Sequence, residues 1–215
     1  MRKLFLLLVS IILPLGASAG ERGFYLDVSF GSSTAESSDF LNSTAGTTTK
    51  VNYENGYNFS SALGYMPQTQ RGVLYHLRFE AEAAIRTNHL SKVAGAEVNN
   101  GHVQVASFMA NALYDLRNSS QVTPYIGGGL GVANVRLNKS TELGFDNSES
   151  DMLGAFQLMT GITFEPSMNS SSALHLGYRY FGTLDDITLQ LSNTAQDVST
   201  DYRAHIIEGG LRVDF

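Results

Sequence analysis

The 215-residue sequence predicts an all-β protein, and three observations support that prediction. Eight segments alternate apolar and polar residues with a period of two, which is the side-chain period of a β-strand. The connections between these segments alternate in length, short after one and long after the next. The chain also combines 21 Gly with only 4 Pro and with clusters of Ser, Thr and Asn, a mixture typical of strands joined by turns.

A leader precedes the first alternating segment. Residues 1–19 carry two basic residues near the start, an apolar run over 4–13, and small residues at 17–19. This is the pattern of a secretory signal peptide, and the apolar run is shorter than the roughly 20 residues that a membrane-spanning helix needs. We predict cleavage before Gly20. The remaining domain, 20–215, then carries a formal net charge of −8 instead of −6, because two basic residues are removed.

The longest alternation is VLYHLRFEAEAAIR at 73–86. One face carries Tyr75, Leu77, Phe79, Ala81, Ala83 and Ile85, and the other carries His76, Arg78, Glu80, Glu82, Ala84 and Arg86. A helix would scatter these charges around its circumference, so the period of two indicates a strand. The segment is longer than an ordinary strand of about 5–6 residues and is long enough for a tilted crossing of a bilayer, which takes about 9–11.

Seven further segments show the same alternation more weakly. They are 23–31, 55–66, 107–116, 123–135, 155–165, 173–181 and 204–215. Upstream of 107, Val103 and Val105 fall out of phase with the apolar face, so we expect a bulge or a late strand start there. The short connections are 67–72, 117–122 and 166–171, and the long polar ones cover about 32–52, 87–101, 138–152 and 182–200.

These strands and connections fit a closed barrel. Short turns at one end and long loops at the other are the pattern of an outer-membrane barrel. A bilayer offers no water to unpaired backbone groups, so a spanning sheet closes, and the terminal GGLRVDF should stay in a strand up to Phe215. Two aromatic belts are expected, with Phe24, Tyr65, Tyr75, Tyr114 and Phe164 near the short turns and Tyr57, Phe108, Tyr180 and Tyr202 near the long loops. The sequence predicts a single eight-stranded antiparallel transmembrane β-barrel after a cleaved signal peptide.

Three segments resemble a known family. The final strand, with Gly210, Val213 and Phe215, resembles the terminal signal that the barrel assembly machinery reads. TPYIGGGLGVA at 123–133 and LGYRYF at 176–181 resemble the fifth and seventh strands of the eight-stranded bacterial outer-membrane β-barrel protein family, which groups OmpA-like transmembrane domains with opacity-type and rickettsial surface antigens. The resemblance implies the outer membrane of a Gram-negative bacterium. It also implies outer-membrane lipid, lipopolysaccharide and the assembly machinery as partners.

The polar strand faces turn toward the barrel interior, which eight strands leave just wide enough for side chains to fill. Charges enclosed by an apolar wall are expected to be paired. The candidates for an interior network are Arg78, Glu80, Glu82, Arg179, Glu208 and Arg212. We expect Arg78 and Arg179 to pair with Glu80 and Glu208. Such a network is either a polar core that satisfies itself or the lining of a narrow, gated ion path, and both interpretations stay open.

Composition excludes several classes of function. An acidic chain lacks the basic footprint of a nucleic-acid-binding protein, so we expect no nucleic acid partner. The chain has no Cys, which excludes disulfides, thiolate metal sites and Cys nucleophiles. We expect no cofactor, no metal and no enzyme activity. A lipid A-modifying enzyme would need a His and a Ser together on the lipid-facing surface, and His205, which has the outward phase, has no Ser partner in its strand.

The long loops are the remaining candidates for a binding function. The loops at 138–152 and 182–200 are acidic, and binding function concentrates in loops on a rigid scaffold. They suit a bridge to lipopolysaccharide phosphates through divalent cations, or a contact with a host or other surface ligand, or they form a solvated acidic surface without a binding role. We therefore expect an outer-membrane surface protein that serves envelope integrity and surface contact, including adhesion. The alternative is a small porin-like channel for ions or small solutes, and a lipid A-modifying enzyme is a third class.

Overall fold

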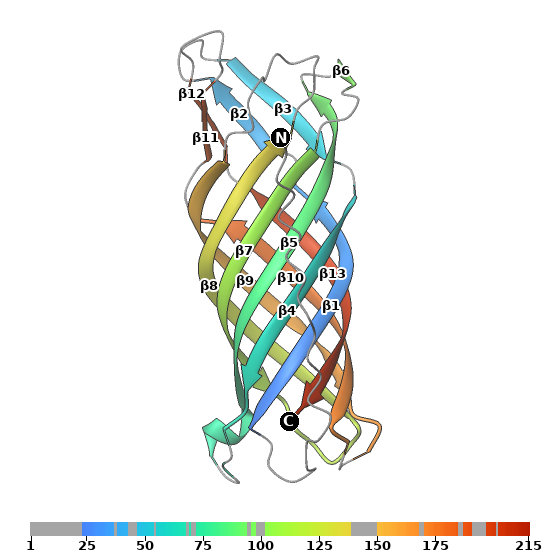
Figure 1. Ribbon diagram of the computed structural model, residues 1–215. Coiled ribbons are helices and arrows are strands. Elements are labelled where there is room, and N and C mark those ends of the chain that lie inside the picture. The colour runs from blue at the N-terminus through green and yellow to red at the C-terminus, as the bar shows by residue number, and fades with distance from the viewer. Residues whose placement is uncertain are drawn as a thin grey trace, which may run out of the picture.

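The computed structural model (Figure 1) describes the barrel strands and parts of the connections. The described residues are 23–36, 38–42, 47–53, 55–67, 69, 72–93, 96–97, 102–138, 150–167, 170–184, 187–190, 197–200 and 202–215. The predicted signal peptide at 1–19 lies outside them. The described elements are strands, apart from one short 3-10 helix.

Eight long strands form the wall of the barrel. They are β1 (Phe24–Ala35), β4 (Gly56–Tyr65), β5 (Leu77–Val93), β7 (His102–Asp115), β8 (Val122–Asn138), β9 (Ser150–Phe164), β10 (Ser172–Thr183) and β13 (Arg203–Asp214). Each pairs antiparallel with its neighbours in that order, and β13 returns to β1. The strands tilt around a closed wall (Figure 1). The prediction of an eight-stranded antiparallel barrel is confirmed.

The closing pair joins the first strand to the last. β1 and β13 stay in register over eleven residue pairs, beginning with Tyr25 opposite Asp214. The amide of Phe215 adds a hydrogen bond of 2.9 Å to the carbonyl of Phe24. The ladder therefore continues to the last residue, as expected for a sheet that leaves no free edge in a bilayer.

The segment predicted as one strand over 73–86 begins with a different element. Val73–His76 form a single turn of 3-10 helix, η1, and β5 starts at Leu77. Gly72 precedes this turn with a φ of 86°, a left-handed conformation that glycine adopts without strain. At its other end β5 runs beyond the predicted limit to Val93. The strand is thus shifted along the sequence relative to the alternation.

The bulge or late start expected near Val103 and Val105 is wrong. β7 is continuous from His102 and pairs with β5 and β8 without a shift of register. Both valines point into the barrel, where neither is more than 3% exposed. The apolar–polar alternation does not predict this part of β7 correctly because Val103 and Val105 pack against other apolar side chains inside the barrel. Apolar residues here therefore lie on both faces of the strand.

The long-loop end carries a second sheet. β11 (Ile187–Gln190), β12 (Asp197–Thr200), β2 (Ser38–Asn42) and β3 (Thr47–Tyr53) pair in that order. β3 also pairs with the outer end of β5, and β6 (Ala96–Glu97) forms a short hairpin with β5. Parts of the segments expected as long loops are therefore strands. In Figure 1 this sheet projects beyond the barrel at the end opposite the C-terminus.

The outer face of the barrel wall is apolar. Phe30, Leu130 and Ile207 are each at least 64% exposed, and many other large apolar side chains on this face are at least 40% exposed. Water-soluble monomers rarely expose so extensive an apolar surface, whereas a lipid-facing barrel requires it. Within the described residues, no helix is long and apolar enough to cross a membrane.

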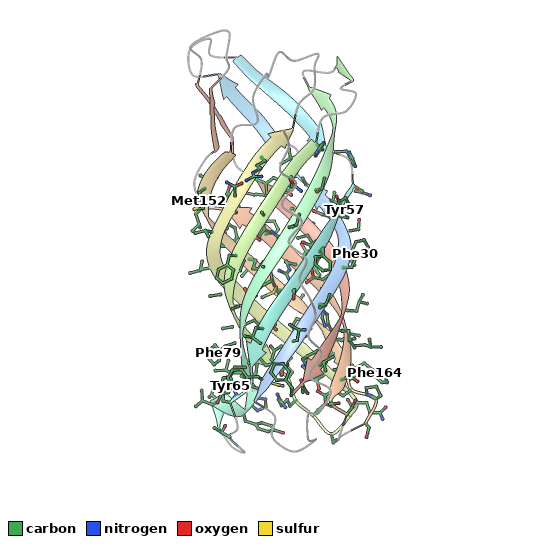
Figure 2. All side chains as sticks on the ribbon, viewed as in Figure 1. Phe30, Tyr57, Tyr65, Phe79, Met152 and Phe164 are labelled. Carbon is green, nitrogen blue, oxygen red and sulfur yellow. The ribbon has the colours of Figure 1, made fainter. Side chains whose placement is uncertain are left out.

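Aromatic side chains frame this apolar band. Tyr65 and Phe164 lie near the short turns, and Tyr57 lies toward the other end (Figure 2). Tyr202, which we expected in the belt near the long loops, is instead 3% exposed inside the barrel. Its hydroxyl donates to Oδ1 of Asn88 at 2.8 Å. The expectation was wrong because Tyr202 has the inward parity of β13, which it directly precedes.

Candidate functional site: the barrel interior

The interior of the barrel is divided into two levels. The level toward the long loops is mainly apolar, although Ser33, Arg86 and Asn88 are also buried there. Its buried apolar cluster contains Ala35, Val103, Val105, Met109, Ala133, Val135, Leu153, Ala155, Phe181, Tyr202, Ala204 and Ile206. The level toward the short turns holds the interior ion pairs. A path along the barrel axis would have to cross both levels.

Arg179 on β10 is the centre of the polar level. Its Nη2 lies 2.7 Å from Oε1 of Glu208 on β13, and its Nη1 donates to Oε1 of Glu82 on β5. Nη1 also donates to Oε1 of Gln157 at 2.9 Å, and the amide of Gln157 donates to Oδ1 of Asn111 at 2.7 Å. All five side chains are buried. Two carboxylates therefore share one guanidinium, and amides occupy further hydrogen-bonding positions, as buried charges require.

A second ion group is centred on Arg78. Its Nε donates to Oδ1 of Asp115 at 2.9 Å, and its Nη1 lies 3.4 Å from Oε1 of Glu80. The hydroxyl of Tyr25 donates to the same Glu80 oxygen at 2.6 Å. The guanidinium of Arg78 also lies over two aromatic rings, with its Cζ 5.8 Å from the Tyr25 centroid and 5.4 Å from the Tyr125 centroid. Charges and rings together fill this part of the interior.

The six interior candidates from the sequence fall into three groups. These are Arg179 with Glu82 and Glu208, Arg78 with Glu80, and Arg212 with Glu165. Nη2 of Arg212 lies 2.8 Å from Oε1 of Glu165. Asp115 is the closest charged partner of Arg78, although nothing in the alternation distinguishes it from Glu80, since both have inward parity on neighbouring strands.

A cavity of about 30 Å³ lies within the polar level. Asp27 and Ser29 on β1 and His175 on β10 meet at its wall, although their spacing in the sequence matches no motif. Oγ of Ser29 lies 3.0 Å from Nε2 of His175, and Nδ1 of His175 lies 3.2 Å from Oδ2 of Asp27. The Ser29 hydroxyl also lies 2.8 Å from Oδ1 of Asp27, to which it donates. The register of the closed wall brings these residues together.

This order of atoms resembles a Ser–His–Asp hydrolase site, but its surroundings do not. The cavity has room for about two water molecules, so an acyl substrate does not fit beside Ser29. The cluster also faces the interior, away from the lipid-facing surface on which a lipid A-modifying enzyme would act. Gly210 makes the arrangement sterically feasible, because a Cβ there would lie 2.6 Å from both His175 Nε2 and Ser29 Oγ. The cluster is best described as a tightly packed polar junction.

The residues of the predicted assembly signal lie on both faces of β13. Gly210 faces the polar junction, and Val213 has the outward parity. Phe215 is 42% exposed at the end of the wall near the short turns. The role of these residues in assembly stays a prediction.

Arg86 on β5 carries a charge into the apolar level, where it is fully buried. Its Nη1 donates to Oγ of Ser107 at 2.9 Å. Its Nε and Nη2 have no hydrogen-bond partner among the residues that the structure describes. In the same part of the chain, no group of three or more His, Asp or Glu side chains is placed to hold a metal ion.

An apolar outer band, a closed eight-stranded wall and an interior filled by side chains together define an outer-membrane β-barrel. The chain belongs to the outer membrane protein beta-barrel domain family, whose model matches residues 4–215. It is therefore a protein of the Gram-negative outer membrane.

The similar curated proteins match part of the chain. The chain is 30% identical over 105 residues to outer membrane protein PagN of Salmonella typhimurium, an alignment that covers 47% of this chain and 44% of PagN. It is 27% identical over 146 residues to an uncharacterized protein of Brucella abortus, covering 54% of this chain and 49% of that protein. The chain thus spans just under half the length of these relatives.

Solved structures match nearly the whole chain. OprG of Pseudomonas aeruginosa has a TM-score of 0.61 at 15% identity and covers 93% of this chain and 100% of its own. Neisserial surface protein A has a TM-score of 0.59 at 20% identity and covers 93% of this chain and 99% of its own. At these identities the similarity is one of fold.

Proposed function

We propose that this chain is a closed surface barrel that supports envelope integrity and makes contacts, including adhesive ones, outside the cell. The observation that carries the proposal is the second sheet, in which β2, β3, β11 and β12 extend the wall beyond the apolar band. A sheet on a rigid barrel is a suitable platform for recognition. The name of Neisserial surface protein A, which shares the fold, agrees with a surface role.

The packed interior favours this proposal over the porin-like alternative. Val105, Met109 and Phe181 in the apolar level are fully buried. Apolar constrictions oppose ion passage because water leaves them. Below this level, charged side chains of the ion pairs, among them Arg78, Glu82 and Arg179, line the cavity of about 30 Å³. A barrel of this kind is expected to conduct weakly or not at all.

The first experiment tests closure. The mature protein is purified in detergent, its folding is checked by a heat-modifiable gel shift, and it is reconstituted in a planar bilayer. We expect the gel shift without steady conductance. Reproducible channels from the shifted species would contradict the closed barrel and support the porin-like function.

The second experiment tests surface contact. The chain is expressed in a Gram-negative strain without adhesins of its own, and bacteria attached to cultured epithelial cells are counted. A variant with 38–53 replaced by a Gly-Ser turn removes β2 and β3, and we expect it to attach less than the wild type. A matched variant alters the short turn at 117–121 at the other end of the barrel and should attach normally. Equal attachment of all three strains at equal surface amounts would reject the proposal.

A further inference from the structure

Two histidines stand opposite each other at the long-loop end of the barrel wall. His89 on β5 and His102, the first residue of β7, form the last residue pair of the ladder between these strands. The two strands are neighbours in the wall (Figure 1). Directly opposed residues of antiparallel strands have Cβ atoms about 4.5–5.5 Å apart and share a face of the sheet, so their side chains meet. The register therefore joins two residues that the connection after β5 separates in the sequence.

Both histidines belong to the outer face of the wall. His102 has the parity of Phe108, which is 58% exposed in the apolar band. On β5, Thr87 is paired with Tyr57 of the aromatic belt, and His89 is the next residue of the same parity beyond it. His89 is exposed and His102 is half-buried. The pair thus lies on the long-loop side of the aromatic belt, beyond the part of the wall that faces lipid.

The two imidazole rings are close enough to share a metal ion. Their centroids lie 6.4 Å apart, and the ring planes are inclined at 57°. A zinc ion about 2.0–2.1 Å from an imidazole nitrogen lies about 3.2 Å from the centroid of that ring, so two rings on one ion have centroids at most about 6.4 Å apart. A tetrahedral ion brings the centroids to about 5 Å. Rotation of the exposed His89 side chain is enough to make this small change.

Other contacts of the two rings are compatible with a metal ion. An imidazole coordinates a metal through one nitrogen while the other nitrogen keeps a hydrogen bond, which also fixes the orientation of the ring. Metal binding therefore does not require that His89 or His102 lack other partners.

A charged neighbour on the next strand is bonded away from the pair. Arg136 on β8 stands opposite Gln104, the outward residue that follows His102 on β7. Its Nε donates to Oδ1 of Asn134 at 3.0 Å, on the side nearer the membrane. This cation is therefore held toward the membrane and not toward the two imidazoles.

We propose that His89 and His102 form a binding site for a divalent transition-metal ion, which takes Cu²⁺ most tightly and also takes Zn²⁺. Imidazole suits both ions, and the affinities of first-row divalent ions reach their maximum at Cu²⁺. Two histidines are fewer than the three protein ligands of a catalytic zinc site, so the remaining positions are left to water or to a donor atom of another molecule.

The proposed site departs from the absence of a metal that the sequence leads us to expect. Neither histidine belongs to a metal-binding motif, and only the register of β5 and β7 brings them together. The site does not rest on the surface contacts proposed for the second sheet, since both of its ligands belong to the barrel wall.

The test titrates the folded protein, prepared in detergent without a histidine tag, with Cu²⁺ and measures binding by isothermal titration calorimetry. His89→Gln should weaken binding at least about tenfold, because the ion is then held at one point instead of two. His102→Gln and the double variant should bind as weakly as His89→Gln, since neither histidine chelates alone. His205→Gln is the matched control and should bind like the wild type, because His205 is an outer-face histidine that stands opposite Thr34 and Tyr180.

Electron paramagnetic resonance of the Cu²⁺-loaded wild type needs no variant that might fail to fold. We expect coupling of the copper to two imidazole nitrogens, and to one in His89→Gln. Zn²⁺ should compete with Cu²⁺ for the same site. Coupling to a single nitrogen in the wild type would indicate an adventitious ion only and would overturn the proposal. Equal affinities of the wild type and His89→Gln, or an equal loss in His205→Gln, would overturn it as well.

Discussion

The guanidinium carbon of Arg86 lies 3.9 Å from the centroid of the Phe181 ring. A desolvated cation–π contact of this kind contributes about 2 kcal/mol or more. The same guanidinium makes one hydrogen bond, to Ser107, while its Nε and Nη2 have no hydrogen-bond partner among the described residues. A buried charge satisfied in this incomplete way costs free energy.

Replacing Arg86 by Met should therefore preserve or raise stability, because it removes the buried charge and keeps an apolar side chain of similar reach. Exchanges of buried charges for apolar residues are neutral or stabilising by about 1–4 kcal/mol. The measurement is urea unfolding of the barrel in lipid vesicles. A loss of several kcal/mol would show that Arg86 has partners that stabilise it.

Arg179 should respond in the opposite way. Arg179→Met leaves Glu82 and Glu208 buried without their shared cation, and breaking a buried ion pair costs about 3–5 kcal/mol. The same unfolding measurement should show this loss. Changing both glutamates to Gln in the Arg179→Met background should restore most of it, since no uncompensated charge is then left. If Arg179→Met alone has the same free energy of unfolding as the wild type, the geometry of the network is contradicted.

Gly210 should tolerate no side chain. Gly210→Ala places a Cβ 2.6 Å from His175 Nε2 and Ser29 Oγ, and overpacking of this kind costs about 1–3 kcal/mol. Gly209→Ala is the matched control, because the nearest atom to its Cβ, the carbonyl oxygen of His175, is 3.7 Å away. Refolding of purified chains in detergent separates packing from assembly: a packing defect appears there, whereas a defect limited to the assembly signal appears only in cells.

A substitution at Phe215 should affect assembly in cells and not refolding of the purified chain, the opposite of the result expected for Gly210. Its side chain is partly exposed on the outer wall, so Phe215→Ser removes few interior contacts. If Phe215 belongs to the signal read by the assembly machinery, the substitution lowers the amount of folded barrel in the outer membrane. Refolding of the purified chain in detergent should change little. Normal amounts of folded barrel in cells would remove Phe215 from the signal.

The apolar level should be the part of the interior that prevents ions from passing through the barrel. Serine at both Val105 and Phe181 would replace two fully buried apolar side chains with small hydroxyls that hold water. We expect single-channel events in planar bilayers that the wild type does not show. Serine at Phe30, on the lipid-facing wall, is the control and should leave the bilayer silent. A silent double variant with a normal gel shift would assign closure to the ion pairs instead.

The apolar–polar alternation predicts the strands of the wall because one face of each strand contacts lipid and the other contacts charged side chains in the interior. It therefore gives the inward parity of Arg78, Glu82 and Arg179 correctly. It fails where both faces of a strand are apolar, so at Val103 and Val105 it wrongly predicts a bulge or a late strand start.

The contact between Asp27, Ser29 and His175 cannot be predicted from the alternation, for another reason. β1 and β10 are separated by β13, so the meeting of their side chains depends on the register of two ladders and on the close approach that Gly210 allows. The second sheet is not predicted because β2, β3, β11 and β12 are only 5, 7, 4 and 4 residues long, so an alternation such as Ile187 and Leu189 in β11 is too brief to indicate a strand.

The strand β5 is 17 residues long and takes part in both sheets. The strand pairs with β4 and β7 in the membrane wall and with β3 beyond it. The hydrogen bonds of these antiparallel ladders run perpendicular to the strand. A pull on the outer sheet along β5 therefore acts as shear on many backbone bonds at once, instead of opening them one after another. A cell attached through this sheet would be held by an unbroken strand anchored in the barrel, without a hinge between the point of attachment and the membrane.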